Sequence, residues 1–563
     1  MIALVAPTAF GATTFDAGDI SEFLRHGHLP RRSRVRDPSG GASGALAYAF
    51  DLAPAAAADV SLLLPLHRLA SLPPAPADPA RAVEARRRRC AAGWRARLDR
   101  VDLRLPPSAA AVAAGVRAQL AYILINRDGA AIQPGSRSYQ RSWIRDGALT
   151  ASALLRLGHA EAVRAFIEWY ARYQYQNGKV PCCVDARGAD PVPEHDSEGE
   201  FIFLVAEYYR YTGDRALIER QWPRVRAAAV YLDSLRHQRR TPEYQAADRR
   251  EFFGLLPPSI SHEGYSAKPM HSYWDDLMAL RGFKDTVALA LALGLPLEVS
   301  RWSAVQAEFE RDLGSSVRST MVRHLIDYVP GCADLGDFDA TATTIALDPV
   351  QAQAALPPEA LRRTFEKYWA FFSNRRAGAA WDAFTPYELR NVGAFVRLGW
   401  RERANQLLDY FLAYRRPPGF GAWAEVVWHD ARTPHFIGDL PHSWVGSDFI
   451  RSVLDMLAYP RESDDALVVG AGIREAWVRE APGVTVHHLP TRYGKLDLLM
   501  RGTASGLEVR LAGDLRVPPG GIVLAPPLVT RRWHATINGA AATVSASGQV
   551  TVRKLPANVV LSR

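Results

Sequence analysis

The densest group of side chains that could do acid–base chemistry is EHDSEGEF, residues 194–201, directly before a long apolar run. Ser197 and Glu200 match the S-x-x-E pattern of a capping box. Glu198 lies in the expected first helical turn, where the helix dipole favours an anion. Capping and dipole effects thus explain two of the acids, whereas Asp196 points from the helix start with only a displaced N-cap as its structural alternative.

A second candidate acid, Glu425, lies in the segment AWAEVVWHD between Trp423 and Trp428 and does not begin a helix. Burying an acid among tryptophans is costly unless the acid is paired or functional, so a functional role is favoured. The following PHSW places His442 and Trp444 at the start of the next predicted helix, where both could face a cavity.

Two further segments, SYQRSWIRDGALT and HSYWDDLMALRG, combine tryptophan with charged side chains. Tryptophan offers a flat apolar face that stacks on a sugar ring, and Arg and Asp give directional hydrogen bonds. Capping pairs account for Ser272 with Asp275, and for Thr385 with Glu388 in TPYE. The candidate binding residues are Trp143, Arg145, Asp146, Trp274, Asp276, Trp423, His442 and Trp444.

Two carboxylates on opposite sides of an aromatic-lined cavity are what cleavage of a glycosidic bond requires. One acid protonates the leaving oxygen, and the other activates water or attacks the sugar. Asp196 and Glu425 are the acids that local structure explains least, so they are the candidate catalytic pair.

Helices must bring these distant segments together. Between residues 106 and 462 the pattern predicts helices beginning near residues 107, 143, 160, 197, 215, 273, 298, 340, 358, 385, 401 and 441. Charged helices alternate with helices that follow long loops rich in aromatics and acids. This alternation predicts a mainly α fold, an (α/α)6 toroid of six hairpins in which the loops before the inner helices line one cavity. A helical solenoid is the alternative, but no repeat of 34 or 40 residues is visible.

The flanking regions contain short alternating runs that are typical of strands. Residues 1–72 are predicted to be an N-terminal β-region, with GALAYAFDL and DVSLLLPLHRL as examples. Residues 73–105 begin with PPAPADPAR, continue as a basic helical stretch and form a predicted linker. Residues 463–563 contain strand-like runs punctuated by Gly, Pro and Asn, which predict a C-terminal β-sandwich.

Composition narrows the functional classes. Of 563 residues, 48% are hydrophobic and 23% are charged, which argues against disorder. The net charge is +9, and the one dense run of basic residues is RRRR at residues 86–89. A solvated connecting helix is favoured there over a nucleic-acid site. The four cysteines show no metal-ligand spacing, and the adjacent pair Cys182 and Cys183 is expected to be reduced and buried.

No cofactor or metal is implied by the sequence. No uncharged apolar stretch approaches about 18 residues, so we expect no membrane span. No signal peptide is visible at the start of the chain, which favours a cytoplasmic location.

These motifs resemble those of the six-hairpin glycosidases, especially glucoamylases and the glucosidase domain of glycogen debranching enzymes. WIRD is similar to the W-x-R-D motif of glucoamylases, which implies that Trp143, Arg145 and Asp146 bind the terminal sugar. HDSEGEFIF is similar to a pattern whose Asp, here Asp196, is the general acid. AWAEVVWHD…GDLPHSW is similar to a segment whose Glu, here Glu425, is the general base.

The resemblance covers residues 106–462 and implies an exo-acting glycoside hydrolase that inverts the anomeric centre of a glycoside or oligosaccharide. The helical barrel followed by a β-domain is also similar to bacterial rhamnosidase-type enzymes. The W-E-E signature of glucoamylases is absent, which argues against an α-1,4-glucan substrate. The N-terminal β-region is short for the large sandwich of such enzymes. The sugar, the linkage, the oligomeric state and whether the chain belongs to a longer protein stay open.

Three other functions stay open as alternatives. An inverting phosphorylase would use phosphate in place of water, but such enzymes lack a carboxylate base, so Glu425 argues against one. A catalytically inactive carbohydrate-binding protein would keep the sugar contacts without two facing acids. An epimerase would rely on histidines paired across the cavity. The candidate histidines are His195, His271 and His442.

Overall fold

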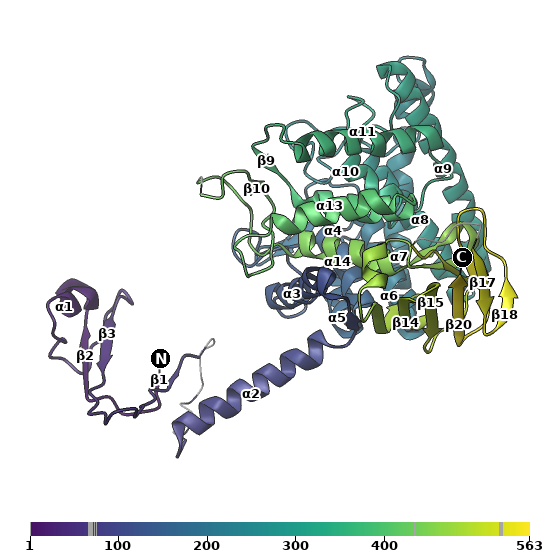
Figure 1. Cartoon of the computed structure of the whole chain (residues 1–563). Helices are drawn as coiled ribbons and strands as arrows, with labels where there is room; N and C mark the ends of the chain where they lie inside the picture. Colours follow the sequence, from purple (N-terminus) through teal and green to yellow (C-terminus); the bar gives the residue numbers. More distant parts are fainter. Residues whose placement is uncertain are drawn as a thin grey trace. The chain divides into compact units, whose positions relative to one another are not determined.

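The structure is a computed structural model that describes residues 2–65, 71, 74, 76–432, 434–527 and 533–562. The chain divides into two compact units, Met1–Asp99 and Arg100–Arg563 (Figure 1). All the candidate site residues lie in the second unit, so the fold of that unit positions the site.

The described residues of the first unit form two small antiparallel strand pairs and two α-helices. Its elements are β1 (Ile2–Ala3), β2 (Ala9–Thr13), α1 (Ile20–Arg25), β3 (Ser43–Ala47), β4 (Leu62–Leu63) and α2 (Pro79–Leu98). Strand β2 pairs with β3, and β1 pairs with β4. The end of the predicted run DVSLLLPLHRL, residues 66–69, lies outside the described residues. On α2, Glu84 accepts hydrogen bonds from Arg87 and Arg88, all exposed to solvent, as in a solvated helix.

The helical part of the second unit follows the predicted helix positions. Each of the twelve predicted starts lies within five residues of the beginning of an α-helix. The helices are α3 (Ala110–Asn126), α4 (Ile144–Arg156), α5 (Ala160–Tyr170), α6 (Ser197–Thr212), α7 (Arg215–His237), α8 (Tyr273–Leu293), α9 (Pro296–His324), α10 (Ala340–Thr343), α11 (Pro358–Arg376), α12 (Arg390–Arg397), α13 (Arg401–Ala413), α14 (Ser443–Leu457) and α15 (Glu475–Arg479).

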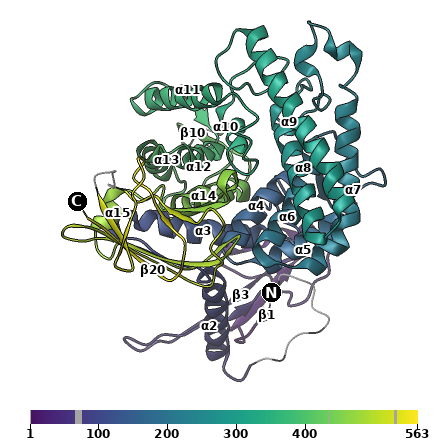
Figure 2. The same ribbon diagram turned by 90° about the vertical axis from the view of Figure 1, so that its right-hand side faces the viewer.

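Burial separates these helices into two alternating sets. All 13 residues of α4 and all 15 of α14 are buried, and most of α6, α8 and α12 is buried. In contrast, α9 buries 7 of its 29 residues and α7 buries 9 of its 23, and Figure 2 shows α7 beyond α6 and α8, at the right-hand edge of the helical region. In the buried set, α6 packs against α4 and α8, α14 against α4 and α12, and the short α10 against α8 and α12. More buried and less buried helices thus alternate along this part of the chain.

Glycines permit the close approach of inner helices. A Cβ on Gly199 of α6 would lie 2.1 Å from the carbonyl oxygen of Met278 in α8, and one on Gly282 would lie 2.9 Å from the Cα of Gly199. No other residue fits at these contacts without moving a backbone, because real Cβ atoms do not approach so closely.

One segment, Pro107–Asn126, is apolar and long enough to cross a membrane by length and composition, with a mean hydropathy of 1.5 and 39% of it buried. A core helix meets the same criterion. This segment includes α3, which packs against α14, and a Cβ on Gly115 would lie 2.9 Å from the ring of Phe449. Among the described helices, this is the one that meets the criterion.

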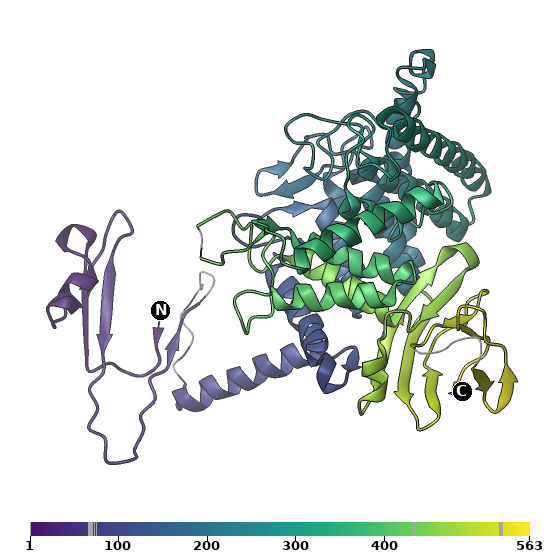
Figure 3. The same ribbon diagram turned by 45° about the horizontal axis from the view of Figure 1, so that its top comes forward.

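The C-terminal region forms two sheets (Figure 3). The first has the order β11-β12-β16-β19, and the second has the order β18-β17-β20-β15-β14-β13-β5. The strands are β5 (Asp102–Arg104), β11 (Ala458–Arg461), β12 (Ala466–Val469), β13 (Val484–Thr491), β14 (Gly494–Gly502), β15 (Gly506–Ala512), β16 (Ile522–Leu524), β17 (His534–Ile537), β18 (Ala540–Ala542), β19 (Val550–Val552) and β20 (Ala557–Ser562).

Strand β5 departs from the expected linker. Residues 73–105 were predicted to be helical, and α2 accounts for much of that stretch, but Asp102–Arg104 pairs with β13 at one edge of the larger sheet. Local periodicity could not reveal this pairing, because the partner strand lies nearly four hundred residues later in the chain.

Candidate active site

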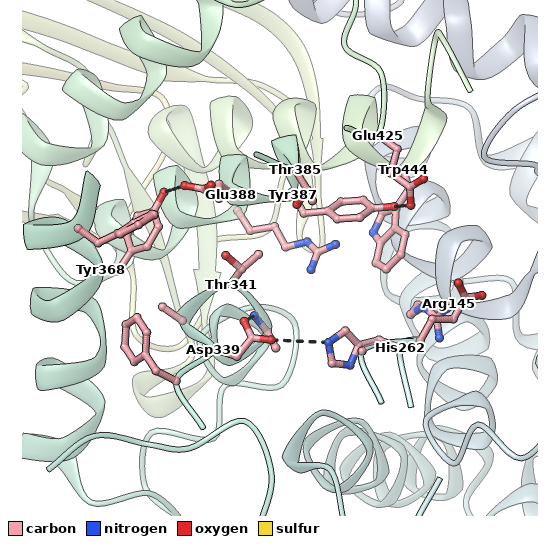
Figure 4. A pocket seen from close by; sticks show the side chains of 17 residues that line it. Arg145, His262, Asp339, Thr341, Tyr368, Thr385, Tyr387, Glu388, Glu425 and Trp444 are labelled. Atoms are coloured by element: carbon pink, nitrogen blue, oxygen red, sulfur yellow. Dashed lines mark hydrogen bonds and ion pairs between the residues drawn. The ribbon is translucent and has the colours of Figure 1, made fainter. Parts of the chain in front are cut away.

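A cavity of about 580 Å³ lies at the N-terminal ends of the buried helices. Its lining includes Arg145 of α4, His262, Glu263 and Gly264 before α8, Phe338–Ala342 at α10, Thr385, Tyr387, Glu388 and Arg390 at α12, and Glu425 and Trp444 at α14 (Figure 4). Starts of four inner helices and the loop before a fifth therefore share one cavity, as the loop pattern predicted. The start of α6 is absent from this lining.

Glu425 is held at the cavity wall by two tyrosines. The hydroxyl of Tyr139 donates a short hydrogen bond to its Oε2, and that of Tyr387 donates to its Oε1 at 3.1 Å. Burial raises the pKa of this carboxyl, while the two tyrosine hydrogen bonds act in the opposite direction by stabilising the ionised form. Figure 4 shows Glu425 beside Tyr387 and Trp444. The carboxylate is therefore fixed in orientation and open to the cavity.

Asp439, which sequence reasoning did not select, positions one of these tyrosines. Its buried carboxylate accepts hydrogen bonds from the backbone amides of Arg137, Ser138 and Tyr139, at 3.0, 2.8 and 3.0 Å. These bonds join the loop before α4 to the loop before α14. Asp439 belongs to the segment GDLPHSW. An acid directly after a glycine was the sequence signal that could have pointed to it.

Gly438 allows the close approach between these loops. It has a φ of +66°, and a Cβ there would lie 2.5 Å from Oε2 of Glu425. A side chain at this position would displace the carboxylate.

Asp196 is fully buried at the start of α6. Its Oδ2 accepts hydrogen bonds from Nε1 of Trp274 at 2.8 Å and from Arg145 at 3.2 Å. Its Oδ1 has no hydrogen-bond partner among the described residues. Asp196 occupies the N-cap position, yet its side chain makes no capping bond. The carboxyl therefore has no capping role, and it lies behind the cavity wall rather than in the lining.

The capping boxes assigned to two glutamates are wrong. Both carboxylate oxygens of Glu200 are buried without a hydrogen-bond partner in the described part of the chain, so this side chain does not reach back to Ser197. Burial raises the pKa of Glu200 well above its ordinary range. Glu388 accepts two hydrogen bonds from Arg375 and one from Tyr368 instead of closing a box at Thr385.

Arg145 links the α6 start to the cavity. Its guanidinium donates to Glu194 at 2.7 Å and to Asp196, and it lies 5.4 Å from the ring centroid of Trp444. Burial raises the pKa of Glu194 to about 7, although Arg145 acts in the opposite direction. Asp146, the next residue on α4, is buried, and burial raises its pKa well above the usual range.

Glu263 is a cavity residue that sequence reasoning missed. It has a φ of +63°, which a glutamate rarely adopts, and its side chain is 52% exposed. Nε1 of Trp143 donates to it at 3.1 Å. Asp275 supports this loop, since its carboxylate accepts bonds from the hydroxyls of Ser259 and Ser261 at 2.5 and 2.6 Å. Backbone strain such as the positive φ of Glu263 is typical of functional positions.

Two predicted binding residues, Asp276 and Trp423, lie away from the cavity lining. Asp276 is fully buried and accepts a hydrogen bond from the backbone amide of Leu256. Trp423 is also buried, donates to the carbonyl of Phe411 and packs on Phe449. Trp274 is buried too, and its ring packs against the lining residues His262 and Trp444, with centroids 5.1 and 6.4 Å away.

His442 has a positioning role. Its Nδ1 accepts from the amide of Val445, so it caps α14, and its ring packs edge-on against Tyr139 and Tyr387. Burial lowers its pKa to about 3 and that of His195 to about 4, so both are neutral near pH 7. Neither is in the cavity lining, where the histidine present is His262.

Among the described residues, one group has the ligand atoms for a metal ion: Cys182, Cys183 and Asp190. It lies outside the cavity lining.

No family model matches this chain, and no curated protein matches its sequence. Solved structures match the fold. An α-L-rhamnosidase from Dictyoglumus thermophilum is 12% identical, with 82% of this chain and 50% of that chain covered and a TM-score of 0.56. A GH78 family rhamnosidase of Bacillus sp. GL1 is 14% identical over 76% of this chain and 42% of that one, with a TM-score of 0.53.

A third structure is an α-L-rhamnosidase from Streptomyces avermitilis complexed with L-rhamnose. It is 13% identical over 82% of this chain and 42% of that chain, with a TM-score of 0.51. The chain thus spans half the length, or less, of the rhamnosidases that it matches. At such identities the likeness establishes a shared fold, a helical domain followed by β-structure.

Proposed function

We propose that this chain is an exo-acting glycoside hydrolase that inverts the anomeric centre, with Glu425 as the general base. The observation that carries the proposal is the carboxylate of Glu425, oriented by two tyrosine hydroxyls at the wall of a cavity lined by Arg145 and Trp444. A base held in this way can take a proton from water, while the arginine and the indole bind the sugar.

The proposed architecture is an (α/α)6 toroid of six hairpins with a C-terminal β-sandwich. The order of packing among the buried helices supports the toroid, since α4, α6, α8, α10, α12 and α14 each pack on the next and α14 packs on α4. Related folds in the three rhamnosidases make a terminal L-rhamnoside the first substrate to test.

Asp196 is the proposed general acid. It lies outside the cavity lining and is bonded to Arg145, so Arg145 must move before Asp196 can reach a substrate. The free Oδ1 of Asp196 supports this assignment, because a carboxyl that neither caps nor pairs fully is available for proton transfer. Glu263 is the rival, since it already lines the cavity. Trp143 and Asp146, beside Arg145, complete the proposed terminal-sugar site.

The test is a panel of aryl glycosides, including the α-L-rhamnoside, with NMR detection of the first-formed anomer. Inversion is expected because the proposed base, Glu425, activates a water that lies between the two carboxyl groups, as in inverting enzymes. Release of a sugar phosphate only when phosphate is present would identify a phosphorylase instead. Binding of sugars without turnover of any glycoside would identify a carbohydrate-binding protein.

A further inference from the structure

Two adjacent cysteines lie behind the sugar site. Cys182 and Cys183 are free and are 2% and 1% exposed, and their Sγ atoms are 3.1 Å apart. Neighbouring side chains of a regular strand point to opposite faces of the sheet. The convergence of these two sulfurs is therefore a local departure at the start of strand β7 (Cys183–Asp185).

The pair is connected to the proposed site through the backbone. Cys183 pairs with Trp143 of strand β6 (Ser142–Trp143), and the carbonyl of Cys182 accepts a 3.0 Å hydrogen bond from the amide of Ile144, the first residue of α4. Trp143 and both cysteines form one buried cluster, against which Tyr139 packs. A change in the conformation of the peptide between the cysteines would thus shift Tyr139, which holds Glu425, and the start of α4, which carries Arg145.

A metal site is less well supported here than thiol chemistry. The ligand atoms of Cys182, Cys183 and Asp190 lie within 4.8 Å of one another. However, the Asp190 carboxylate already accepts from Arg141 at 2.9 Å and from the amide of Val192. A cation would compete with that guanidinium. Hydrogen bonding to Cys183 and burial also raise the pKa of Cys182, which opposes a metal site because a metal needs both sulfurs ionised together. A disulfide needs only one thiolate at a time.

We propose that Cys182 and Cys183 are an oxidative modification site at which a peroxide forms a vicinal disulfide, and that this bond weakens sugar binding at the adjacent cavity. One thiol reduces the peroxide, becomes a sulfenic acid and releases water. The second thiol attacks the sulfenic sulfur, which forms the S–S bond and releases a second water. The pair loses two electrons, and the peroxide gains them.

Bond formation must distort the peptide that holds α4. A disulfide needs its sulfurs about 2.05 Å apart, so the two Sγ atoms must approach by about 1 Å. The peptide between the cysteines becomes part of an eight-membered ring and must twist. Its carbonyl is the one that accepts from Ile144, so oxidation is expected to break or lengthen that bond.

The first experiment tests the chemistry without relying on activity. The full chain is treated with hydrogen peroxide, denatured, alkylated and digested, and the peptide that contains both cysteines is weighed. We expect the peptide to carry no alkyl group and to weigh two hydrogens less than its unalkylated, reduced form. Treatment with dithiothreitol before alkylation should give the peptide with two alkyl groups. Cys332→Ala, which removes a buried cysteine elsewhere, should behave like the wild type, and Cys182→Ala should not form the product. A pair that stays reduced while exposed Cys90 is oxidised would overturn the proposal.

The second experiment tests the coupling and rests on the proposed function only in its kinetic arm. Hydrogen–deuterium exchange of the peptide that begins α4 should become faster on oxidation in the wild type and stay unchanged in Cys182→Ala. The KM for the best glycoside should rise several-fold and recover on reduction. A disulfide that leaves both exchange and KM unchanged would refute the coupling. If no glycoside is turned over, the mass and exchange results still decide the modification.

Discussion

The start of α6 and the loop before α14 are both acidic, yet they place their acids in opposite environments. At the α6 start, Asp196, Glu198 and Glu200 are buried with little or no access to solvent. In the loop before α14, Glu425 reaches the cavity and is held by two tyrosine hydroxyls. A cluster of acids is therefore weaker support for catalysis than one acid that is oriented by hydrogen-bond donors beside a cavity.

The largest expected effect is on turnover. Glu425→Gln should lower kcat by about 10³-fold, because general acid–base catalysis contributes on that scale. Asp196→Asn should lower kcat similarly if Asp196 is the acid. Glu263→Gln should then raise KM with a smaller change in kcat. Steady-state kinetics on the best aryl glycoside, with circular dichroism as the folding control, checks these outcomes. The reverse order for Asp196 and Glu263 would assign the acid to Glu263.

The next largest effect concerns a cavity acid that is paired. Glu388 lines the cavity, but it is bonded to Arg375 at 2.9 and 2.7 Å. Arg375→Met should lower the free energy of unfolding by about 3 kcal/mol, because it leaves a buried carboxylate without its cation. Urea denaturation measures the change. The double variant Arg375→Met/Glu388→Leu should recover part of the loss, and no recovery would contradict the pairing argument.

Removing one donor to Glu425 should have a moderate effect. Tyr387→Phe deletes a hydrogen bond that lowers the pKa of Glu425, so that pKa should rise. The base must be ionised to act, so the acidic limb of the kcat/KM profile should move to higher pH, and the rate at a fixed pH on that limb should fall. Tyr410→Phe, outside the cavity lining and without a bond to Glu425, serves as the matched control. An unshifted limb would remove Glu425 as the base.

The smallest effect on turnover is expected from a buried acid of the α6 start, where stability is the property that changes. Burial raises the pKa of Glu198 to about 8 from an ordinary value of 4.5, so the folded state prefers its protonated form. Stability from this group is full below pH 4.5 and is lost as the pH rises towards 8. Glu198→Gln should remove that dependence, which amounts to several kcal/mol at most across this window, because each pKa unit corresponds to about 1.4 kcal/mol.

Thermal unfolding from pH 4.5 to 8 tests this expectation, with Glu402→Gln at an exposed position as the control. Parallel curves for the wild type and Glu198→Gln would contradict a buried, protonated Glu198. Glu194 and Asp276, whose pKa values are also raised by burial to about 7 and 8, contribute in the same direction to both curves. The difference between the two proteins therefore isolates Glu198.

The sequence by itself determined the helical elements and their alternation. Hydrophobic periodicity is local, so the starts of α4, α6, α8 and α14 could be placed within a few residues, and the loops that line the cavity followed from the order of inner helices. The acid at Glu425 was also identified from its neighbours, because tryptophans around an acid that begins no helix are a local signal.

Which acids are buried and which are oriented at the cavity depends on tertiary contacts. The Tyr139–Glu425 hydrogen bond joins residues 286 positions apart, and the Asp439 carboxylate binds amides about 300 positions away. No local pattern encodes such partners. The capping boxes at Glu200 and Glu388 were wrong although their S-x-x-E and T-x-x-E spacings fit a cap. Glu200 is buried without a hydrogen-bond partner among the described residues, and Glu388 bonds to Arg375 of the preceding helix.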